Sequence, residues 1–216
     1  LFRRSKKIFV LSILVVLIST LLWSISFLSI YSRPNTRVTA SKWINQNIPA
    51  ESNLAVEHWD DRLPLFNSEK YNFLEMPLYE NDQSFLKWKT VNSNLQKADY
   101  LILASNRLYV PLQKLANCQK YTVCYPKTAQ YYQDLFSGKL GFEKVAEFTS
   151  FPSFLGLKIN DQSADESFTV YDHPKIMIFK KKPTNDISKN EQNFHLPGIT
   201  KINNCRLSQT SKKGKI

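Results

Sequence analysis

The sequence predicts one N-terminal transmembrane helix followed by a small mixed α/β sandwich, with parallel strands first and an antiparallel hairpin at the end. An uncharged apolar run covers residues 8–31. Short apolar strand patterns then alternate with amphipathic helix patterns, which is the order of a parallel sheet. Two last strand patterns follow each other within a few residues, and such short connections are typical of antiparallel pairing.

Residues 8–31 form the predicted membrane segment. Its 24 residues would span roughly 36 Å as a helix, enough for a hydrocarbon core about 30 Å thick. A cleaved signal peptide is the alternative, because residues 38–40 (VTA) resemble a cleavage site, but a signal h-region has only about 7–15 residues. Four basic residues within 1–7, against Arg33 and Arg37 after the run, favour a cytoplasmic N-terminus and an exterior domain in a cell membrane.

The first half of the domain alternates helix and strand. Residues 36–46 have a helical pattern that ends before Pro49, and residues 53–57 (NLAVE) form a short apolar run suited to a buried strand. Four apolar residues recur at helical spacing within 82–96, and residues 99–104 (DYLILA) are again a predicted strand.

The second half is predicted to add one helix and several strands. Residues 126–135 begin with a proline, which favours the first turn of a helix, and residues 142–148 and 155–159 have strand patterns. Residues 168–171 and 175–180 are expected to pair as a hairpin across Asp172-His173-Pro174. Right-handed crossovers would place the first three strands side by side.

The net charge of +11 lies at the two ends of the chain. Residues 1–7 carry +4 and residues 180–216 carry +7, so residues 8–179 are neutral with 16 basic and 16 acidic side chains. A neutral body argues against nucleic acid as a partner. The predicted organisation is a basic cytoplasmic flank (1–7), a membrane helix (8–31), an extracytoplasmic domain (32–182) and a disordered basic tail (183–216).

Glycine is scarce, with five in all and the first at Gly138. A P-loop and a dinucleotide-binding turn both need closely spaced glycines between a strand and a helix. The common types of ATP, GTP and NAD site are therefore excluded.

Polar side chains follow two strands that are predicted to be neighbours. Asp60 and Asp61 come after the NLAVE strand, and Asn106 and Arg107 come after the DYLILA strand. Because open α/β sheets bind ligands at the carboxyl ends of their strands, these four residues are the candidate ligand-binding cluster. The carboxylates, with His58, could hold a divalent metal or sugar hydroxyls. The structural alternative is a charge-assisted contact between Arg107 and one aspartate.

Cys118 and Cys124 enclose five residues and match no zinc-ligand spacing. In an oxidising exterior they could form a disulfide worth about 2 kcal/mol in the chain-entropy model. Two free thiols are the alternative.

Tyr131, Tyr132 and Phe136 could stack on sugar rings, but their spacing is more typical of a helix packed on a sheet. No nucleophile elbow is present. We assign no catalytic role to the acid/base pairs Asp165-Glu166 and Asp172-His173 or to any other histidine.

Four stretches resemble the C-terminal region of bacterial multi-pass GT-C glycosyltransferases, similar to polyprenyl-phosphate-sugar-dependent mannosyl- and arabinosyltransferase-like membrane proteins. They are SKWINQNIPAESNLAVEHWDDRLP (41–64), KADYLILASNRLY (97–109), YYQDLFSGKLGFEKVAEF (131–148) and ADESFTVYDHPKIMIFKK (164–181). The resemblance implies a last membrane helix followed by an extracytoplasmic domain. The segment 117–124 departs from the pattern as an insertion.

In such enzymes the catalytic acid lies in an early exterior loop, which this sequence lacks. The resemblance therefore implies no catalytic residue and no cofactor in this segment, and it leaves a divalent metal open only for the parent enzyme. The implied partners are the lipid bilayer, a lipid-linked sugar donor and an envelope acceptor. The alternative is a complete single-pass protein whose exterior domain binds a partner without catalysis.

Overall fold

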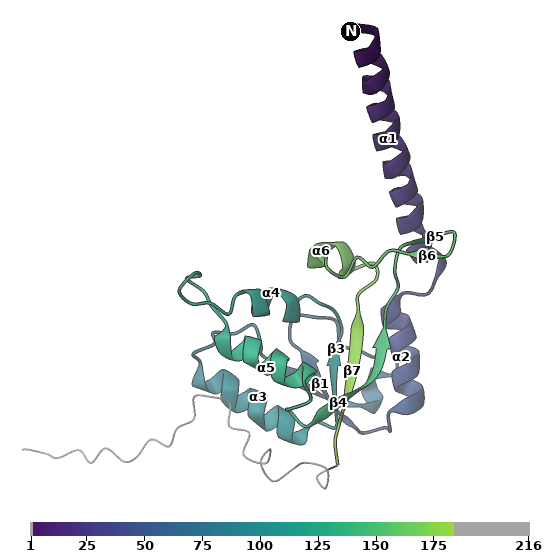
Figure 1. Cartoon of the computed structure of the whole chain (residues 1–216). Coiled ribbons are helices and arrows are strands. Elements are labelled where there is room, and N and C mark those ends of the chain that lie inside the picture. Colours follow the sequence, from purple (N-terminus) through teal and green to yellow (C-terminus); the bar gives the residue numbers. More distant parts are fainter. Residues whose placement is uncertain (1, 184–216) are drawn as a thin grey trace, which may run out of the picture.

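The structure is a computed structural model that describes residues 2–183, with side chains from Lys6 onward, so the predicted tail lies outside the described residues apart from Pro183. Figure 1 shows a long helix that projects from one end of a mixed α/β domain. The helices are α1 (Phe2–Leu28), η1 (Ser29–Ser32), α2 (Thr36–Asn47), η2 (Ser68–Lys70), α3 (Phe85–Lys97), α4 (Tyr109–Lys114), α5 (Pro126–Phe136) and α6 (Glu166–Thr169). The strands are β1 (Asn53–Glu57), β2 (Asn72–Met76), β3 (Tyr100–Leu103), β4 (Phe142–Phe148), β5 (Ser153–Phe154), β6 (Leu157–Lys158) and β7 (Ile176–Lys181).

Helix α1 belongs to the one helical stretch of the described residues that is long and apolar enough to cross a membrane. None of its most apolar window is buried against the rest of the protein. From Lys6 onward its hydroxyl groups are satisfied within the helix; Ser12 and Thr20, for example, donate to carbonyls one turn earlier, at 2.9 and 2.8 Å. Such bonds let serine and threonine occupy an otherwise apolar helix without an unpaired polar group.

The main sheet has five strands in the order β2-β1-β3-β7-β4. Strand β1 is parallel to both β2 and β3, whereas β7 runs antiparallel to β3 and β4. The mixed α/β class, with the parallel strands first, is therefore confirmed. The expectation that the first three predicted strands lie side by side is wrong for β4, because β7 separates it from β3. The first four residues of β7 are buried apolar side chains, which suit a central strand, while β4 exposes three consecutive residues, as an edge strand can.

The predicted pairing of residues 168–171 with 175–180 is also wrong. Residues 166–169 form α6, whose start is capped by Asp165 through a bond from the Ser167 amide to the carboxylate, at 3.1 Å. The antiparallel hairpin of this structure is instead β5–β6, whose two-residue turn is Leu155-Gly156. The predicted strand 155–159 therefore corresponds to one arm of a small separate hairpin.

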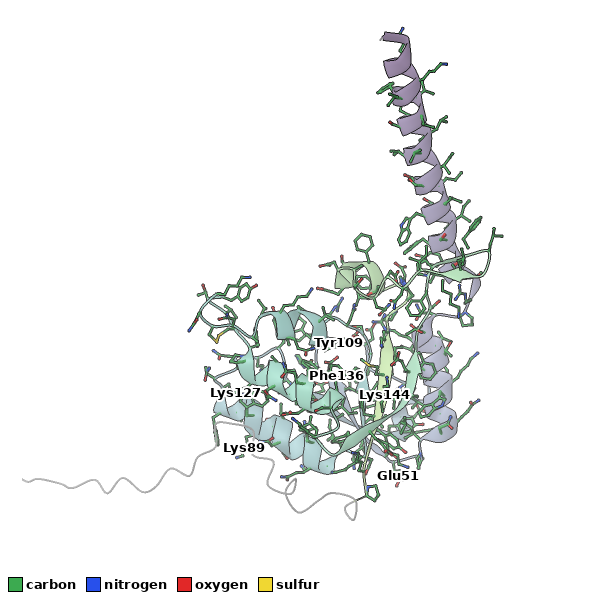
Figure 2. The ribbon with its side chains drawn as sticks, viewed as in Figure 1. Glu51, Lys89, Tyr109, Lys127, Phe136 and Lys144 are labelled. Carbon is green, nitrogen blue, oxygen red and sulfur yellow. A yellow bond between two sulfur atoms is a disulfide. The ribbon has the colours of Figure 1, made fainter. Side chains whose placement is uncertain are left out.

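Helices cover both faces of the main sheet. Residues of α3, α4 and α5 pack with inward-facing residues of β1, β3 and β7 in one apolar cluster, and α2 packs on the opposite face in a second. Tyr109 of α4 and Phe136 of α5 pack edge to face, with ring centroids 5.5 Å apart (Figure 2). Burial on both faces explains why β1, β3 and β7 are almost continuously apolar.

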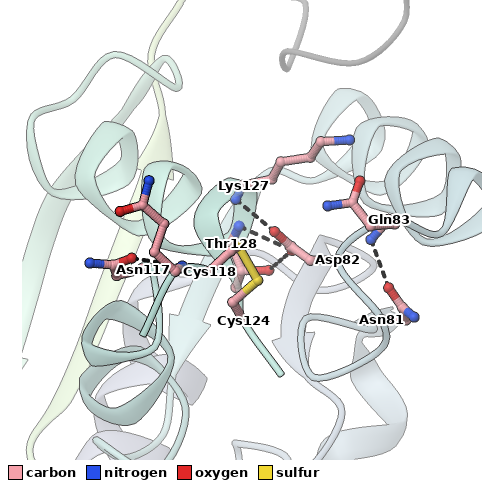
Figure 3. Close-up of a disulfide and its surroundings, with 9 residues drawn as sticks. Asn81, Asp82, Gln83, Asn117, Cys118, Cys124, Lys127 and Thr128 are labelled. Carbon is pink, nitrogen blue, oxygen red and sulfur yellow. Dashed lines mark hydrogen bonds between the residues drawn. A yellow bond between two sulfur atoms is a disulfide. The ribbon is translucent and has the colours of Figure 1, made fainter. Parts of the chain in front are cut away.

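A buried acid joins the start of α5 to the start of α3. The Asp82 carboxylate accepts hydrogen bonds from the amides of Lys127 and Thr128, at 2.7 and 3.2 Å, and forms a 3.0 Å ion pair with the fully buried Lys87. Figure 3 shows the two amide contacts. Satisfied charges of this kind fix the relative position of two helices.

A disulfide closes the loop between α4 and α5. Of the two alternatives that the sequence left open, the structure has Cys118 bonded to Cys124, with Cα atoms 5.1 Å apart (Figure 3). The bond lies in the segment 117–124 that departs from the resemblance.

Candidate functional site

The candidate site lies at the carboxyl ends of β1 and β3. These strands are parallel, with Val56 opposite Ile102, so the loops that follow them begin side by side. This confirms the predicted proximity of the two strand ends. Strand β7 enters the sheet next to the end of β3, where Met177 pairs with Leu103. In Figure 1 this edge of the sheet is at the end of the domain from which α1 projects.

The Asp60 side chain is buried at this edge and bonds to several chain segments. One carboxylate oxygen forms a 2.9 Å ion pair with Arg37 of α2 and also accepts the Asp61 amide, at 2.9 Å. The other oxygen accepts the Ser105 hydroxyl from the loop after β3. Asp61 is 75% exposed and only 3.9 Å from Arg37 at its closest approach. Asp60 therefore ties three chain segments together, while Asp61 is free to contact solvent.

Arg107 does not form the ion pair that the sequence suggested. It donates instead to the Trp59 carbonyl, at 3.1 Å, and to the Tyr171 hydroxyl, at 2.8 Å. The physical reason is a tight turn after β3. The Ser105 hydroxyl donates a hydrogen bond to the Asp60 carboxylate and accepts one from the Arg107 amide, at 3.1 Å, so Ser105 rather than Arg107 contacts this acid. The guanidinium then lies over the Tyr171 ring, 5.4 Å from its centroid, in a cation–π contact. The aspartate's partner is Arg37, which the sequence did not single out.

Asn106 holds α6 against the sheet. Its side chain is buried and exchanges hydrogen bonds with the Thr169 hydroxyl, at 3.0 and 3.2 Å. Both functional atoms of the amide are therefore engaged within the domain.

An aromatic row extends from this edge of the sheet to Tyr125, a buried residue at the start of α5. It consists of His58, Trp59, Tyr79 and Tyr125, whose successive ring centroids are 5.7, 5.7 and 6.0 Å apart. Trp59 is 56% exposed and Tyr79 is 50% exposed. Large aromatic faces left open to water beside polar loops are typical of a binding surface. The sequence pointed to the segment that contains Trp59, but not to Tyr79 or Tyr125, which lie far from it along the chain.

Glu57, the last residue of β1 and the neighbour of His58, is a buried acid. It accepts a 2.5 Å hydrogen bond from the Tyr132 hydroxyl, and its second carboxylate oxygen has no partner among the described residues. Burial raises the pKa of Glu57 from 4.5 to about 8; the bond from Tyr132 opposes that rise and the nearby Asp60 charge adds to it. The carboxyl group is thus predominantly protonated at neutral pH.

A pocket of about 260 Å³ lies beside the same loop. Its lining residues are Asp61, Arg62, Pro64, Leu65, Ser68 and Phe73. Arg62 lies over the Phe73 ring, 5.5 Å from its centroid, and is 3.7 Å from Glu75. Exposed charge beside an aromatic face suits a polar ligand that also has an apolar surface, such as a saccharide.

The aromatic and histidine candidates of the sequence analysis have contacts within the domain. Tyr131 and Tyr132 are fully buried in the core, as the packing interpretation expects. His173 is fully buried, with a ring nitrogen 2.7 Å from Asp161. Asp172 accepts the Tyr31 hydroxyl, at 2.7 Å.

Within residues 2–183, no group of three or more His, Cys, Asp or Glu side chains is placed to hold a metal ion. Comparison with protein-family models and with curated protein sequences finds no match to this chain. Its function is therefore inferred from the chemistry and position of the site.

Proposed function

We propose that this chain is the membrane-anchored, extracytoplasmic part of a GT-C type glycosyltransferase that uses a lipid-linked sugar. In this proposal α1 crosses the membrane, and the carboxyl edge of the sheet binds the saccharide acceptor. The transfer chemistry belongs to another part of the enzyme. The aromatic row, which begins with His58 and Trp59 at the carboxyl edge of the sheet, is the observation that carries the proposal.

The position of the carboxyl edge of the sheet relative to α1 is set by polar contacts. The Tyr31 hydroxyl donates to Asp172, and the Thr36 hydroxyl donates to the Pro174 carbonyl, both at 2.7 Å. Residues 172–174 lead directly into β7, which enters the sheet beside the end of β3. The end of α1 and the candidate site therefore belong to the same end of the domain, where a lipid-linked substrate would be presented.

The chemistry of the row supports a saccharide ligand. Sugar rings have an apolar C–H face, which packs against an aromatic face, and hydroxyl groups, which need hydrogen-bonding partners. Trp59 and Tyr79 offer exposed rings, while Asp61 and His58 offer exposed polar groups in the same loop.

The disulfide supports an extracytoplasmic domain. Disulfides persist in oxidising compartments and are rare in the cytosol. Together with the basic flank before α1, the Cys118–Cys124 bond favours a cytoplasmic N-terminus and an exterior domain.

The proposal is tested by sugar transfer from polyprenyl-phosphate-mannose in membranes that contain the full product of the gene. The reading frame immediately upstream of Leu1 is determined first; a continuous frame that encodes several hydrophobic helices supports a multi-pass enzyme. Trp59→Ala is then expected to raise the KM for the acceptor about two- to tenfold, which corresponds to roughly 0.5–1.5 kcal/mol for a lost aromatic contact.

Phe85→Ala is the matched control, because Phe85 is an exposed aromatic residue on α3 outside the row. It is expected to leave transfer unchanged. Equal effects of the two substitutions would contradict an acceptor site at the row. A start codon within a few residues of Leu1, with no transfer, would instead favour a single-pass exterior binding protein.

A further inference from the structure

The β5–β6 hairpin is hydrogen-bonded to Ser29 and Arg33, which follow the end of α1. The Ser153 amide donates to the Ser29 hydroxyl, at 2.9 Å, and the two serine hydroxyls are 3.0 Å apart. Arg33 adds bonds to the Phe151 carbonyl, at 3.3 Å, and to the Ser153 hydroxyl, at 2.5 Å. The hairpin is therefore held beside residue 29, at the level where the helix enters the domain (Figure 1).

That level coincides with the edge of a bilayer if α1 spans it as proposed. Residues 8–28 extend roughly 30 Å as a helix, which matches the hydrocarbon core. Trp23 and Tyr31 are both exposed near this end, as aromatic residues of the membrane interface are. Residue 29, and the hairpin bonded to it, would then lie at the boundary between hydrocarbon and headgroups.

The tip of the hairpin is apolar and fully displayed. Leu155 is 88% exposed and Leu157 is 75% exposed. Leu155 also has a φ of 47° and Gly156 a φ of 84°. A two-residue turn with two positive φ values favours Asn-Gly, because a leucine Cβ is disfavoured in the left-handed region. The backbone of this turn therefore gives no reason for a leucine at position 155. Because a leucine side chain this exposed is also unfavourable in water, we expect its environment in the working protein to be apolar.

A second exposed aromatic surface lies at the same end of the domain. Phe168 of α6 and Tyr171 after it are both more than half exposed, and the adjacent Asp172 is bonded to Tyr31 at the foot of α1, at 2.7 Å. Figure 1 shows α6 and the hairpin at the end of the domain from which α1 projects.

We propose that the hairpin tip, formed by Leu155 and Leu157, inserts into the interfacial layer of the bilayer, with α6 as a second point of contact. This inference rests on the proposed membrane anchor. The bilayer is the favoured occupant because the hairpin is bonded to the helix that enters it. Lys158 is exposed beside Leu157, and a cationic side chain next to an inserted apolar tip can reach lipid phosphates. The domain would thus rest on the membrane in one fixed orientation, with the carboxyl edge of its sheet toward the surface.

The test measures the collisional accessibility of nitroxide labels on the full chain in phosphatidylcholine–phosphatidylglycerol bilayers. Single cysteines replace Leu155, Leu157, Leu17 and Leu86 in a Cys205→Ser background, with labelling under non-reducing conditions that keep the Cys118–Cys124 bond. Leu17 lies in the middle of α1 and reports on the anchor. Leu86 is the matched control, because it is an exposed leucine on α3, which is not at the α1 end of the domain.

The expected result is that labels at positions 17, 155 and 157 collide more with oxygen than with a water-soluble nickel chelate, while the label at position 86 shows the reverse. Nickel accessibility at 155 and 157 equal to that at 86, with 17 still in lipid, would overturn the inference and leave the anchor intact. Protection of 155 and 157 from both reagents would show a protein partner in place of lipid and also overturn it. Nickel accessibility at 17 would overturn the membrane anchor itself, and the inference with it.

Discussion

Glu57 is an acidic residue in buried surroundings, which disfavour its charged form. It ends β1 inside the domain, and within residues 2–183 the Tyr132 hydroxyl is the one donor to its carboxyl group. Burial raises its pKa to about 8. The folded protein therefore keeps a proton that an unfolded chain, with a pKa near 4.5, releases above about pH 5.

Stability is consequently predicted to fall as pH rises. Between about pH 5 and pH 8 the native state binds up to one more proton than the unfolded state, so Glu57 lowers the unfolding free energy by up to about 1.4 kcal/mol for each pH unit. Above about pH 8 both states are ionised and the effect is constant. Glu57→Gln, which can still accept from Tyr132, should remove this slope and make the protein more stable than wild type at pH 8. Denaturant unfolding of the full chain in detergent from pH 5 to pH 9 measures it, and parallel curves for the two proteins would contradict the buried-acid assignment.

Asp60 and Asp61 are adjacent acids with different expected roles. Asp60→Asn should lower the unfolding free energy by about 3 kcal/mol, because it weakens a buried pair and leaves the Arg37 charge uncompensated. Asp61→Asn is the matched control and should change stability by less than about 0.5 kcal/mol, since Asp61 is mostly exposed. Thermal unfolding of both variants in detergent distinguishes them. A larger loss for Asp61→Asn would reverse the assignment.

The sequence predicted where the acids meet but not which arginine they meet. The strand ends of β1 and β3 could be placed together because a parallel crossover leaves little choice. Arg107 follows β3 directly and was the natural candidate, whereas Arg37 is 23 residues from Asp60 on a helix whose docking the sequence does not specify. Side-chain direction after a strand depends on turn contacts such as those of Ser105, which periodicity does not report.

At the scale of elements, strongly patterned segments were predictable and context-dependent ones were not. The bounds of β1 and β4 agree with the predicted 53–57 and 142–148, and α2, α3 and α5 are within a few residues of their predictions. Strand β2 was missed because it is an edge strand that keeps only its last residue fully buried, so it lacks an apolar run. Helix α4 was missed because six residues carry little periodicity.

The last strand shows why topology was harder than element type. Its apolar pattern predicted a strand at 175–180, and β7 is present at Ile176–Lys181. Its partners were predicted from sequence proximity, whereas the sheet uses β3 and β4. A strand with every side chain buried in its first four positions gains most in the middle of a sheet covered on both faces. That gain comes from the tertiary arrangement and cannot be read from neighbouring residues.

At the scale of the whole molecule, α1, η1 and α2 join the proposed membrane anchor to the domain with few intervening residues. Only Arg33, Pro34 and Asn35 separate η1 from α2. This short connection is bonded to the domain by three side chains. Arg33 donates to the Phe151 carbonyl, Asn35 to the Asp172 carbonyl and Thr36 to the Pro174 carbonyl. The domain is therefore not expected to swing freely, as it would on a flexible linker.

The topology is predicted to be N-terminus inside and domain outside. In a Cys205→Ser background, a cysteine that replaces the exposed Lys70 should react with a membrane-impermeant maleimide in intact cells. A cysteine at Lys6, before the apolar run, should react only after lysis. The reverse pattern would overturn the orientation, and reaction of both in intact cells would show that α1 does not span.

The central place of β7 sets the order in which the domain can be completed during synthesis. Until Ile176–Lys181 have emerged, β3 and β4 have no partner on their facing edges, and the sheet consists of β2-β1-β3 and a separate β4. The nascent chain must therefore hold two open strand edges apart while about 180 residues are translocated, a state prone to mispairing. Insertion of the last strand between β3 and β4, with β3 about 75 residues earlier in the chain, makes final assembly a late and cooperative step. A chain that ends before Ile176 would keep its anchor and most of its helices, yet would lack the strand that unites the two halves of its core.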